Sequence, residues 1–194
     1  RTLNGIEWVN DLTYGRTFSW QQQAGWFEVS PKEPDQLHLK LYWPAEQGLF
    51  SLLKQLRRLF DLDADINLIE QQLLLHPLFQ HGIISGLRIP GIWNTWEAGV
   101  RAVLGQQVSV AAARTHLNRL VTELGTALPG SSDKMLFPSP AAVMHSELDM
   151  LKMPQRRKET LRALATYMAE YPEADPERWL ALKGIGPWTV NYAK

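Results

Sequence analysis

The stretch Leu-Lys-Gly-Ile-Gly-Pro-Trp-Thr at residues 182–189 decides the predicted fold of the second half of the chain. A short helix is expected to end at Leu182, and Pro187 suits the first position of the next helix. Two glycines flank Ile185, so the backbone can turn sharply and approach a partner closely. Amides at the start of the next helix are unpaired and suit a phosphate. Taken alone, the two glycines indicate either an ordinary tight turn between helices or a helical hairpin whose amides can hold a phosphate.

Capping signals on either side of this hairpin predict a run of short helices. Asn94, with Glu97 three residues later, begins a helix that stops at residues 105–107, and Ser109 begins the next one. Short connections between such helices are typical of an orthogonal bundle, which we place at residues 65–194. Further helices are marked by Ser139-Pro140, by Asp175-Pro176 and by the stripe Leu161, Leu164, Ala165 and Met168.

The first part of the chain has a different periodicity. Residues 37–42 alternate between apolar and polar side chains, which predicts a strand, and residues 26–30 are its predicted partner across a turn rich in proline. Between residues 46 and 60 the leucines recur at spacings of three and four, which predicts a helix that can lie on the sheet. We therefore expect a small antiparallel α+β domain at residues 1–64.

Composition limits the class of protein. The chain of 194 residues contains no cysteine, which excludes disulfides, cysteine zinc sites and iron–sulfur clusters. No apolar run approaches the roughly 18 residues of a membrane span, so we expect a soluble protein. The net charge is zero, but residues 1–80 hold seven Lys and Arg against ten Asp and Glu, whereas residues 81–194 hold thirteen against ten. Any surface that contacts nucleic acid would therefore be expected in the second half.

The hairpin in its sequence context resembles the helix-hairpin-helix superfamily. A second string is more specific. Leu-Arg-Ile-Pro-Gly at residues 87–91, Trp96-Glu97 and Val-Arg-Ala-Val-Leu-Gly-Gln-Gln-Val-Ser at residues 100–109 resemble the bacterial DNA-3-methyladenine glycosylase II group. Residues 137–140 and 153–154 are similar to further landmarks of these enzymes. The resemblance implies an α+β fold, in which a small N-terminal sheet domain with a packing helix precedes an all-α helix-hairpin-helix bundle.

The resemblance also implies a function, which is the excision of alkylated purines such as 3-methyladenine from duplex DNA. Gln107 lies where the family places the wedge that fills the gap left by the flipped base. Trp188 and Tyr192, four residues apart on one helix face, lie where the family stacks the damaged base. Two alternatives stay open: Gln107 could bond its own backbone at the helix end, and the two aromatic residues could be plain core.

Further roles follow from the same resemblance. Gly184, Gly186 and the Thr189 amide are expected to hold DNA phosphate. The carbonyls of Leu180, Leu182 and Ile185 are expected to hold a structural monovalent cation, and no cofactor is required. The basic residues that could meet phosphates are Arg101, Arg114, Arg119 and the cluster Arg156, Arg157 and Lys158.

The family's chemistry needs a carboxylate that stabilises positive charge on the sugar. In the family pattern this Asp lies beyond Lys194, so we expect the chain of 194 residues to be catalytically inactive on its own. Asp175 and Glu177 precede the hairpin and more simply cap a helix and begin it.

Three other classes of protein remain as alternatives. A glycosylase that also cleaves the strand would carry a Schiff-base lysine where Trp188 stands, and Lys183 and Lys194 are not at that position. A non-catalytic helix-hairpin-helix DNA-binding module would explain the hairpin, but not residues 87–109. A helical scaffold that binds no DNA is the third. We expect a monomer in the bacterial cytoplasm, with double-stranded DNA that contains alkylated bases as its partner.

Overall fold

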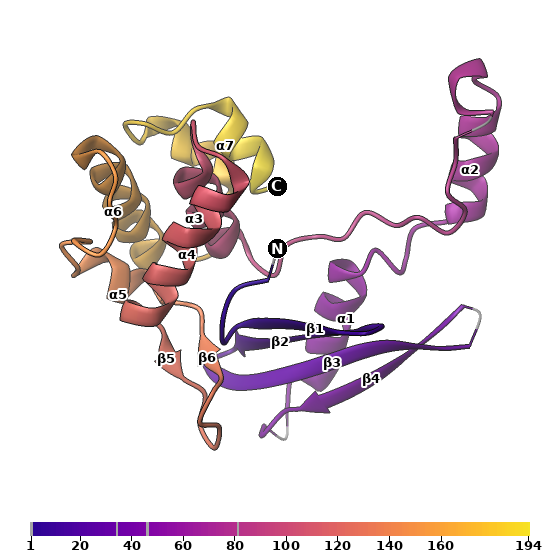
Figure 1. Ribbon diagram of the computed structural model, residues 1–194, viewed down its shortest axis with the longest axis horizontal. Coiled ribbons are helices and arrows are strands. Elements are labelled where there is room, and N and C mark those ends of the chain that lie inside the picture. Colours follow the sequence, from indigo (N-terminus) through magenta and orange to yellow (C-terminus); the bar gives the residue numbers. More distant parts are fainter. Residues whose placement is uncertain (1, 34, 46, 81) are drawn as a thin grey trace. The chain divides into compact units, whose positions relative to one another are not determined.

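The computed structural model describes residues 2–33, 35–45, 47–80 and 82–194, and it has an α+β fold that begins with an antiparallel sheet (Figure 1). Its four strands follow one another as a meander, so that each strand pairs with the next one along the chain. The strands are β1 (Glu7–Asn10), β2 (Thr13–Trp20), β3 (Gln23–Glu33) and β4 (Gln36–Tyr42).

The two predicted strands are confirmed as parts of β3 and β4, but the predicted turn is displaced. β3 continues through Pro31, which pairs with Leu37, and the chain reverses after Glu33. β3 tolerates Pro31 because β2 pairs with β3 only as far as Val29. No residue of β2 therefore needs the backbone N–H that proline lacks. The reversal includes Asp35, whose φ of 67° lies in the left-handed region.

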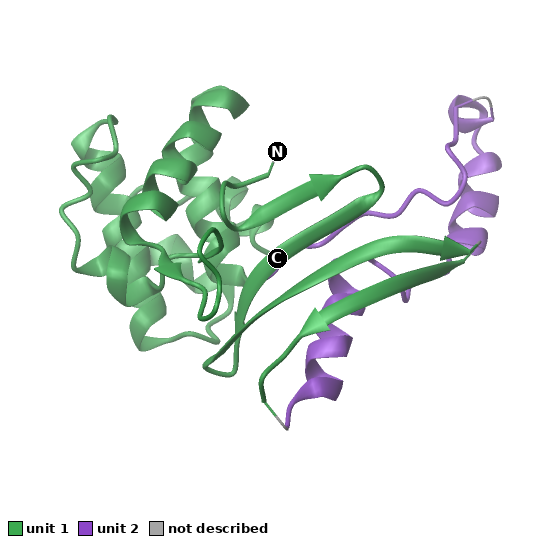
Figure 2. Cartoon of the chain, turned by 60° about the horizontal axis from the view of Figure 1, so that its bottom comes forward, with its two compact units in different colours: residues 1–46, 94–194 green, residues 47–93 purple. Residues whose placement is uncertain are grey.

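The chain divides into two compact units (Figure 2). Unit 1 comprises residues 1–46 and 94–194, and unit 2 comprises residues 47–93. The division does not coincide with the boundary expected at residues 64 and 65, because the sheet belongs to the same unit as the later helices. The predicted boundary between the domains stays a prediction.

The helices of unit 1 surround a core of apolar side chains. Gly99 of α3 has no side chain and leaves room for the ring of Trp179, since a Cβ atom at Gly99 would lie 2.9 Å from that ring. Trp179 is fully buried, and it fixes the approach to the hairpin against α3. The helices are α3 (Thr95–Gly105), α4 (Val110–Leu124), α5 (Pro140–Met144), α6 (Gln155–Glu170) and α7 (Pro187–Tyr192), with a 3-10 helix at Pro176–Ala181 before α7.

The predicted helix starts are confirmed by hydrogen bonds at their caps. The side chain of Asn94 accepts from the Glu97 amide at 2.8 Å. Ser109 and Ser139 cap α4 and α5 in the same way. Asp175 caps a 3-10 helix instead of an α-helix. Each cap accepts an amide that the helix itself leaves unpaired.

Two short strands interrupt the part of the chain that was expected to be entirely helical. They are β5 (Thr126–Ala127) and β6 (Met135–Leu136), which pair with each other. The Thr17 hydroxyl on β2 donates to the Met135 carbonyl, and the Met135 amide donates to the Gly5 carbonyl at 2.8 Å. The small hairpin therefore attaches to the N-terminal sheet within unit 1.

Unit 2 contains α1 (Leu49–Leu59), α2 (Ile66–Leu74) and a 3-10 turn at Pro77–Phe79. α1 is the helix predicted over residues 46–60, and its leucines at positions 52, 56 and 59 are buried. Glu46 lies outside the described residues. α2 has no buried residue. Among the described residues, no helix combines the length and the apolar character needed to cross a membrane.

Candidate nucleic-acid interface

The predicted hairpin is present at residues 182–187. The Ile185 amide donates to the Leu182 carbonyl at 3.1 Å, and Pro187 is the first residue of α7. Gly184 has a φ of 91°, which a residue with a Cβ atom adopts at a cost. The side chain of Ile185 is buried.

Two side chains from other helices hold the hairpin in place. The Thr160 hydroxyl of α6 lies 3.1 Å from the Lys183 carbonyl and 3.0 Å from the Arg156 carbonyl, and it can donate its one proton to either. The side-chain amide of Gln106, just after α3, donates to the Gly184 carbonyl at 3.1 Å. Gln106 also lies 3.2 Å from the Thr189 hydroxyl, to which it donates. Neither Gln106 nor Thr160 was expected to contact the hairpin. Only the place of Gln106 inside the string at residues 100–109 singled it out.

The three residues expected to hold phosphate differ in their surroundings. Thr189 is buried, and its amide donates to the Gly186 carbonyl at 3.0 Å, so this amide already has a partner. Gly186 faces open space, because an added Cβ atom would meet nothing within 4 Å. Gly184 is in close contact with Thr160. The structure therefore leaves Gly186 as the place where a ligand can approach the hairpin backbone most closely.

The aromatic pair lies on the surface of α7. Trp188 is 59% exposed and Tyr192 is 43% exposed. Their rings stack with centroids 5.6 Å apart and an angle of 27° between the planes. Exposure on this scale excludes the alternative that the two rings are part of the core of the described structure. The large ring of Trp188 is therefore accessible to a ligand at the surface of α7.

Gln107 stands at the turn between α3 and α4. Its φ of 54° lies in the left-handed region, where residues other than glycine are uncommon and often functional. Its side chain is exposed, and within the described residues it has no hydrogen bond, so the alternative in which it bonds its own backbone is not observed.

A cleft of about 550 Å³ brings these features together within unit 1. It is bordered by the turn that carries Gln107, by the start of α6, by the hairpin and by Trp188. No Asp or Glu lies among its lining residues, while two arginines do. The lining residues are Gly105, Gln106, Gln107, Pro154, Arg156, Arg157, Thr160, Gly184 and Trp188. Gly186, Thr189 and Tyr192 are not among them.

The basic residues named from the sequence separate into paired and unpaired ones. Arg101 contacts Glu97 at 2.6 Å and Glu7 at 3.2 Å, and Lys158 is buried beside Asp149 at 3.5 Å. These two side chains are occupied, so the expectation that they meet phosphates is not supported. Arg156 is exposed and Arg157 is half-buried, and both line the cleft.

Arg114 and Arg119 lie on α4 outside the cleft, Arg114 exposed and Arg119 half-buried. Burial, together with the charges of Arg119 and Arg157, lowers the pKa of His116. His116 is therefore neutral at neutral pH, and the positive charge beside the cleft is carried by the arginines.

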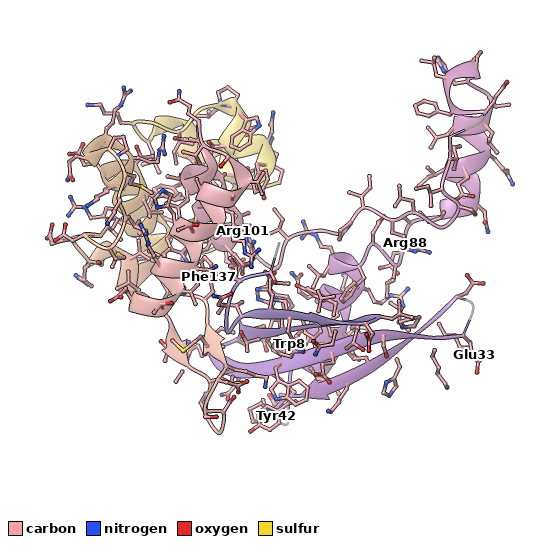
Figure 3. The ribbon with its side chains drawn as sticks, in the orientation of Figure 1. Trp8, Glu33, Tyr42, Arg88, Arg101 and Phe137 are labelled. Carbon is pink, nitrogen blue, oxygen red and sulfur yellow. The ribbon has the colours of Figure 1, made fainter. Side chains whose placement is uncertain are left out.

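A buried ion-pair network joins the sheet to α3. Arg16 of β2 contacts Glu97 at 2.7 Å, and Arg101 links Glu97 to Glu7 of β1. In Figure 3 the labelled Arg101 extends from α3 toward these strands. The network fixes the helix whose end presents Gln106 and Gln107. Sequence reasoning missed it, because Arg16 and Glu97 lie far apart along the chain.

Possible sites for metal and for acid chemistry are limited. Among the described residues, no group of three or more His, Cys, Asp or Glu could hold a metal ion. The Leu182 carbonyl already accepts the Ile185 amide, and the carbonyl site for a monovalent cation stays a prediction. Asp175 accepts the Glu177 amide at 2.9 Å, and Glu177 pairs with Lys194. Asp175 therefore caps a helix as expected, and Glu177 lies in the first turn of that 3-10 helix, while its ion pair with Lys194 was not expected.

Comparisons with known proteins identify relatives of this chain. A family model described as the AlkA N-terminal domain matches residues 1–94. The chain is 32% identical to DNA-3-methyladenine glycosylase 2 of Escherichia coli, over 99% of this chain and 71% of that protein. It is 34% identical to a Mycobacterium tuberculosis protein described as a probable bifunctional transcriptional activator/DNA repair enzyme AlkA. That match covers 96% of the chain, which spans 40% of the length of the relative.

A solved structure supports the fold independently. The 3-methyladenine DNA-glycosylase from Archaeoglobus fulgidus superposes with a TM-score of 0.82, over 96% of this chain and 69% of that one. The identity between the two chains is 15%, so this likeness concerns the fold alone.

Proposed function

The chain belongs to the DNA-3-methyladenine glycosylase 2 family, and on this premise we propose that it recognises DNA lesions for a base-excision repair glycosylase that releases alkylated purines such as 3-methyladenine. The cleft is the observation that carries the proposal, because Gln107, Gly184 and Trp188 border the same space. Base flipping needs a side chain to fill the gap, a grip on the backbone and a ring that receives the base. These three features come from three separate segments of the chain.

In the proposed mechanism, Gln107 enters the base stack as the damaged nucleotide rotates out. The flipped base, still bonded to its sugar, stacks on Trp188, whose ring is exposed and stacks on that of Tyr192. Alkylation makes a purine electron-poor and often cationic, so an aromatic face attracts it. Stacking of one base on an aromatic side chain contributes about 1–3 kcal/mol.

The backbone of the same strand is proposed to run along the hairpin. Gly186 leaves room for a phosphate to approach, and Arg156 and Arg157 place positive charge in the cleft. A monovalent cation on the hairpin carbonyls would add positive charge beside that phosphate. Duplex DNA with an alkylated base is the proposed partner of a monomer, in the cytoplasm where the bacterial chromosome lies.

The proposed reaction is hydrolysis of the glycosidic bond. It needs a carboxylate facing the sugar, and no carboxylate lines the cleft of this chain. We therefore expect the chain of 194 residues to release no base by itself. Trp188 stands where strand-cleaving relatives use a Schiff-base lysine, so we expect borohydride to trap no covalent adduct with DNA. A trapped adduct would contradict the assignment as a monofunctional enzyme.

The test measures the release of methylated bases from alkylated duplex DNA by the full-length protein and its Trp188→Ala variant. We expect the variant to lose roughly tenfold or more in the rate of release, because the base loses its stacking surface. Tyr171→Ala is the matched control, since Tyr171 is also exposed, lies against Tyr167 with tilted rings whose centroids are 5.1 Å apart, and does not line the cleft. This control should keep the wild-type rate.

Two outcomes would replace the proposal. Equal affinity for intact DNA and for DNA with an abasic-site mimic, without base release, would favour a non-catalytic DNA-binding module. No affinity for either DNA would favour a helical scaffold.

A further inference from the structure

Gln106 lies between two features to which the proposed function gives separate roles. Along the chain it is the neighbour of Gln107, the proposed wedge. In the folded chain its side-chain amide donates to the Gly184 carbonyl at 3.1 Å and to the Thr189 hydroxyl at 3.2 Å. Both acceptors belong to the hairpin segment. One side chain therefore links the turn after α3 to the proposed phosphate grip.

Both segments joined by this side chain have unusual backbone conformations. Gln107 has a φ of 54° and Gly184 has a φ of 91°. A left-handed residue other than glycine persists only where its surroundings hold it in place. Gln106 is the residue directly before Gln107, and its anchored side chain limits how the turn can move relative to the hairpin.

We propose that Gln106 is a positioning residue that couples the wedge to the hairpin, so that a hairpin seated on the DNA backbone holds Gln107 at the height of the base stack. The inference rests on the proposed function. Gln106 lines the cleft, but its side-chain amide is bonded to the hairpin, and the proposal gives it no contact with the base or the phosphate. Without the link, the hairpin still binds the backbone, but the wedge is no longer held in register with it. The loss therefore falls on recognition of the lesion rather than on general affinity for DNA.

The fold around Gln106 does not depend on its amide. The last turns of α3 are held by Val100, Val103 and Leu104, all fully buried. The hairpin has a second support, because the Thr160 hydroxyl can donate to the Lys183 carbonyl. Replacing the Gln106 amide should therefore leave the melting temperature nearly unchanged.

The experiment compares wild type, Gln106→Ala and Gln106→Glu in the full-length protein. It measures affinity for duplex DNA with an abasic-site mimic and for intact duplex, together with 2-aminopurine fluorescence opposite the mimic as a report on wedge insertion. We expect the ratio of the two affinities to fall about tenfold in both variants near neutral pH, since two hydrogen bonds are lost. Affinity for intact DNA should change by less than about twofold, as for a residue without a phosphate contact.

The Glu variant supplies a readout that a merely structural role would not give. Its ionised carboxylate cannot donate to the Gly184 carbonyl, whereas the neutral acid can donate one hydrogen bond. Relative to wild type, its discrimination should therefore recover as the pH falls from about 8 toward the ordinary glutamic acid range near 4.3. Gln106→Ala should show no recovery. Gln72→Glu is the control for added charge, because Gln72 is an exposed residue of α2.

Each outcome decides between the proposals. Wild-type discrimination in Gln106→Ala, or a Glu variant without recovery at low pH, would overturn the coupling while the proposed function stands. Equal loss of affinity for both DNAs would also overturn it, because that result indicates a direct backbone contact. Wild-type protein that neither discriminates the mimic nor releases bases would instead remove the proposed function on which the coupling rests.

Discussion

Glu97 is a fully buried carboxylate with two guanidinium partners. It accepts from Arg16 at 2.7 Å and from Arg101 at 2.6 Å. Burial alone would raise the pKa of Glu97, but the charges of both arginines outweigh burial and leave this pKa below its ordinary value of 4.5. Glu97 is therefore ionised at neutral pH, and loss of its charge would leave Arg16 buried without its closest partner.

Glu97→Gln should reduce the free energy of unfolding at neutral pH by about 3–5 kcal/mol, the usual cost of removing one partner from a buried pair. Urea denaturation of the chain measures this difference. Glu147→Gln is the matched control, because Glu147 pairs with Arg162 at 3.0 Å with its side chain 80% exposed. An exposed pair of this kind contributes about 0–1 kcal/mol. Equal effects of the two substitutions would contradict the role assigned to the buried network.

The same pair gives a pH dependence of defined sign. Because the folded state lowers the pKa of Glu97, its charge stabilises the fold above the ordinary value of 4.5. This stability is lost as the pH falls through the lower folded pKa. The difference between wild type and Glu97→Gln should therefore narrow below pH 4.5.

Single residues show where sequence reasoning ends. The pairing of Asn94 with the Glu97 amide was predictable, because a cap is local to one helix turn. The partner of the Glu97 carboxylate was not, since Arg16 lies on β2 and only the folded chain brings the two together. Gln106 is a similar case, because its acceptors lie on the hairpin.

At the scale of an element, the hairpin uses its two glycines for different purposes. Gly184 has a positive φ, and an added Cβ atom would lie 2.2 Å from the Thr160 hydroxyl. Gly186 has a φ of −119° and open space where a Cβ atom would lie. The sequence shows the two glycines as equivalent, whereas the structure makes one a requirement of the fold and the other a point of approach.

Gly184→Ala should therefore destabilise the chain by about 1–3 kcal/mol or more, through backbone strain and the clash with Thr160. Gly186→Ala should change the free energy of unfolding by less than about 0.5 kcal/mol. It should nevertheless weaken DNA binding, because its methyl group occupies the space of an approaching phosphate. Denaturation and DNA binding, measured on both variants, test these separate roles of the two glycines. A Gly186→Ala variant less stable than Gly184→Ala would contradict them.

Elements with local signals were predictable, and those that depend on distant partners were not. The caps at Ser109 and Ser139 and the proline at the start of α7 were read correctly from the sequence. β1 and β2 were missed because they lack the strict alternation that marks β4. On β2 the buried run includes Arg16 and Thr17, whose partners are Glu97 and the Met135 carbonyl. Because these polar side chains are buried against distant partners, β2 lacks the apolar–polar alternation by which a strand is recognised in a sequence.

At the scale of the whole molecule, zero net charge conceals a separation of charge. Several acidic residues form ion pairs with basic ones, as in the network around Glu97 and the pair of Lys158 with Asp149. The cleft differs, because Arg156 and Arg157 line it and no carboxylate does. Dependence of DNA affinity on salt reports the phosphates neutralised at the contact and not the net charge of the protein.

Arg156→Ala and Arg157→Ala should each lower the slope of log affinity against log salt concentration by about one, if each arginine contacts one phosphate. The effect should be alike for DNA of any sequence, since a phosphate contact carries no sequence information. Arg162→Ala is the control on the same helix, because Arg162 pairs with Glu147 and does not line the cleft. Its slope should equal that of wild type. An unchanged slope in both cleft variants would remove α6 from the interface and leave the hairpin, Gln107 and Trp188 as the remaining candidate contacts with DNA.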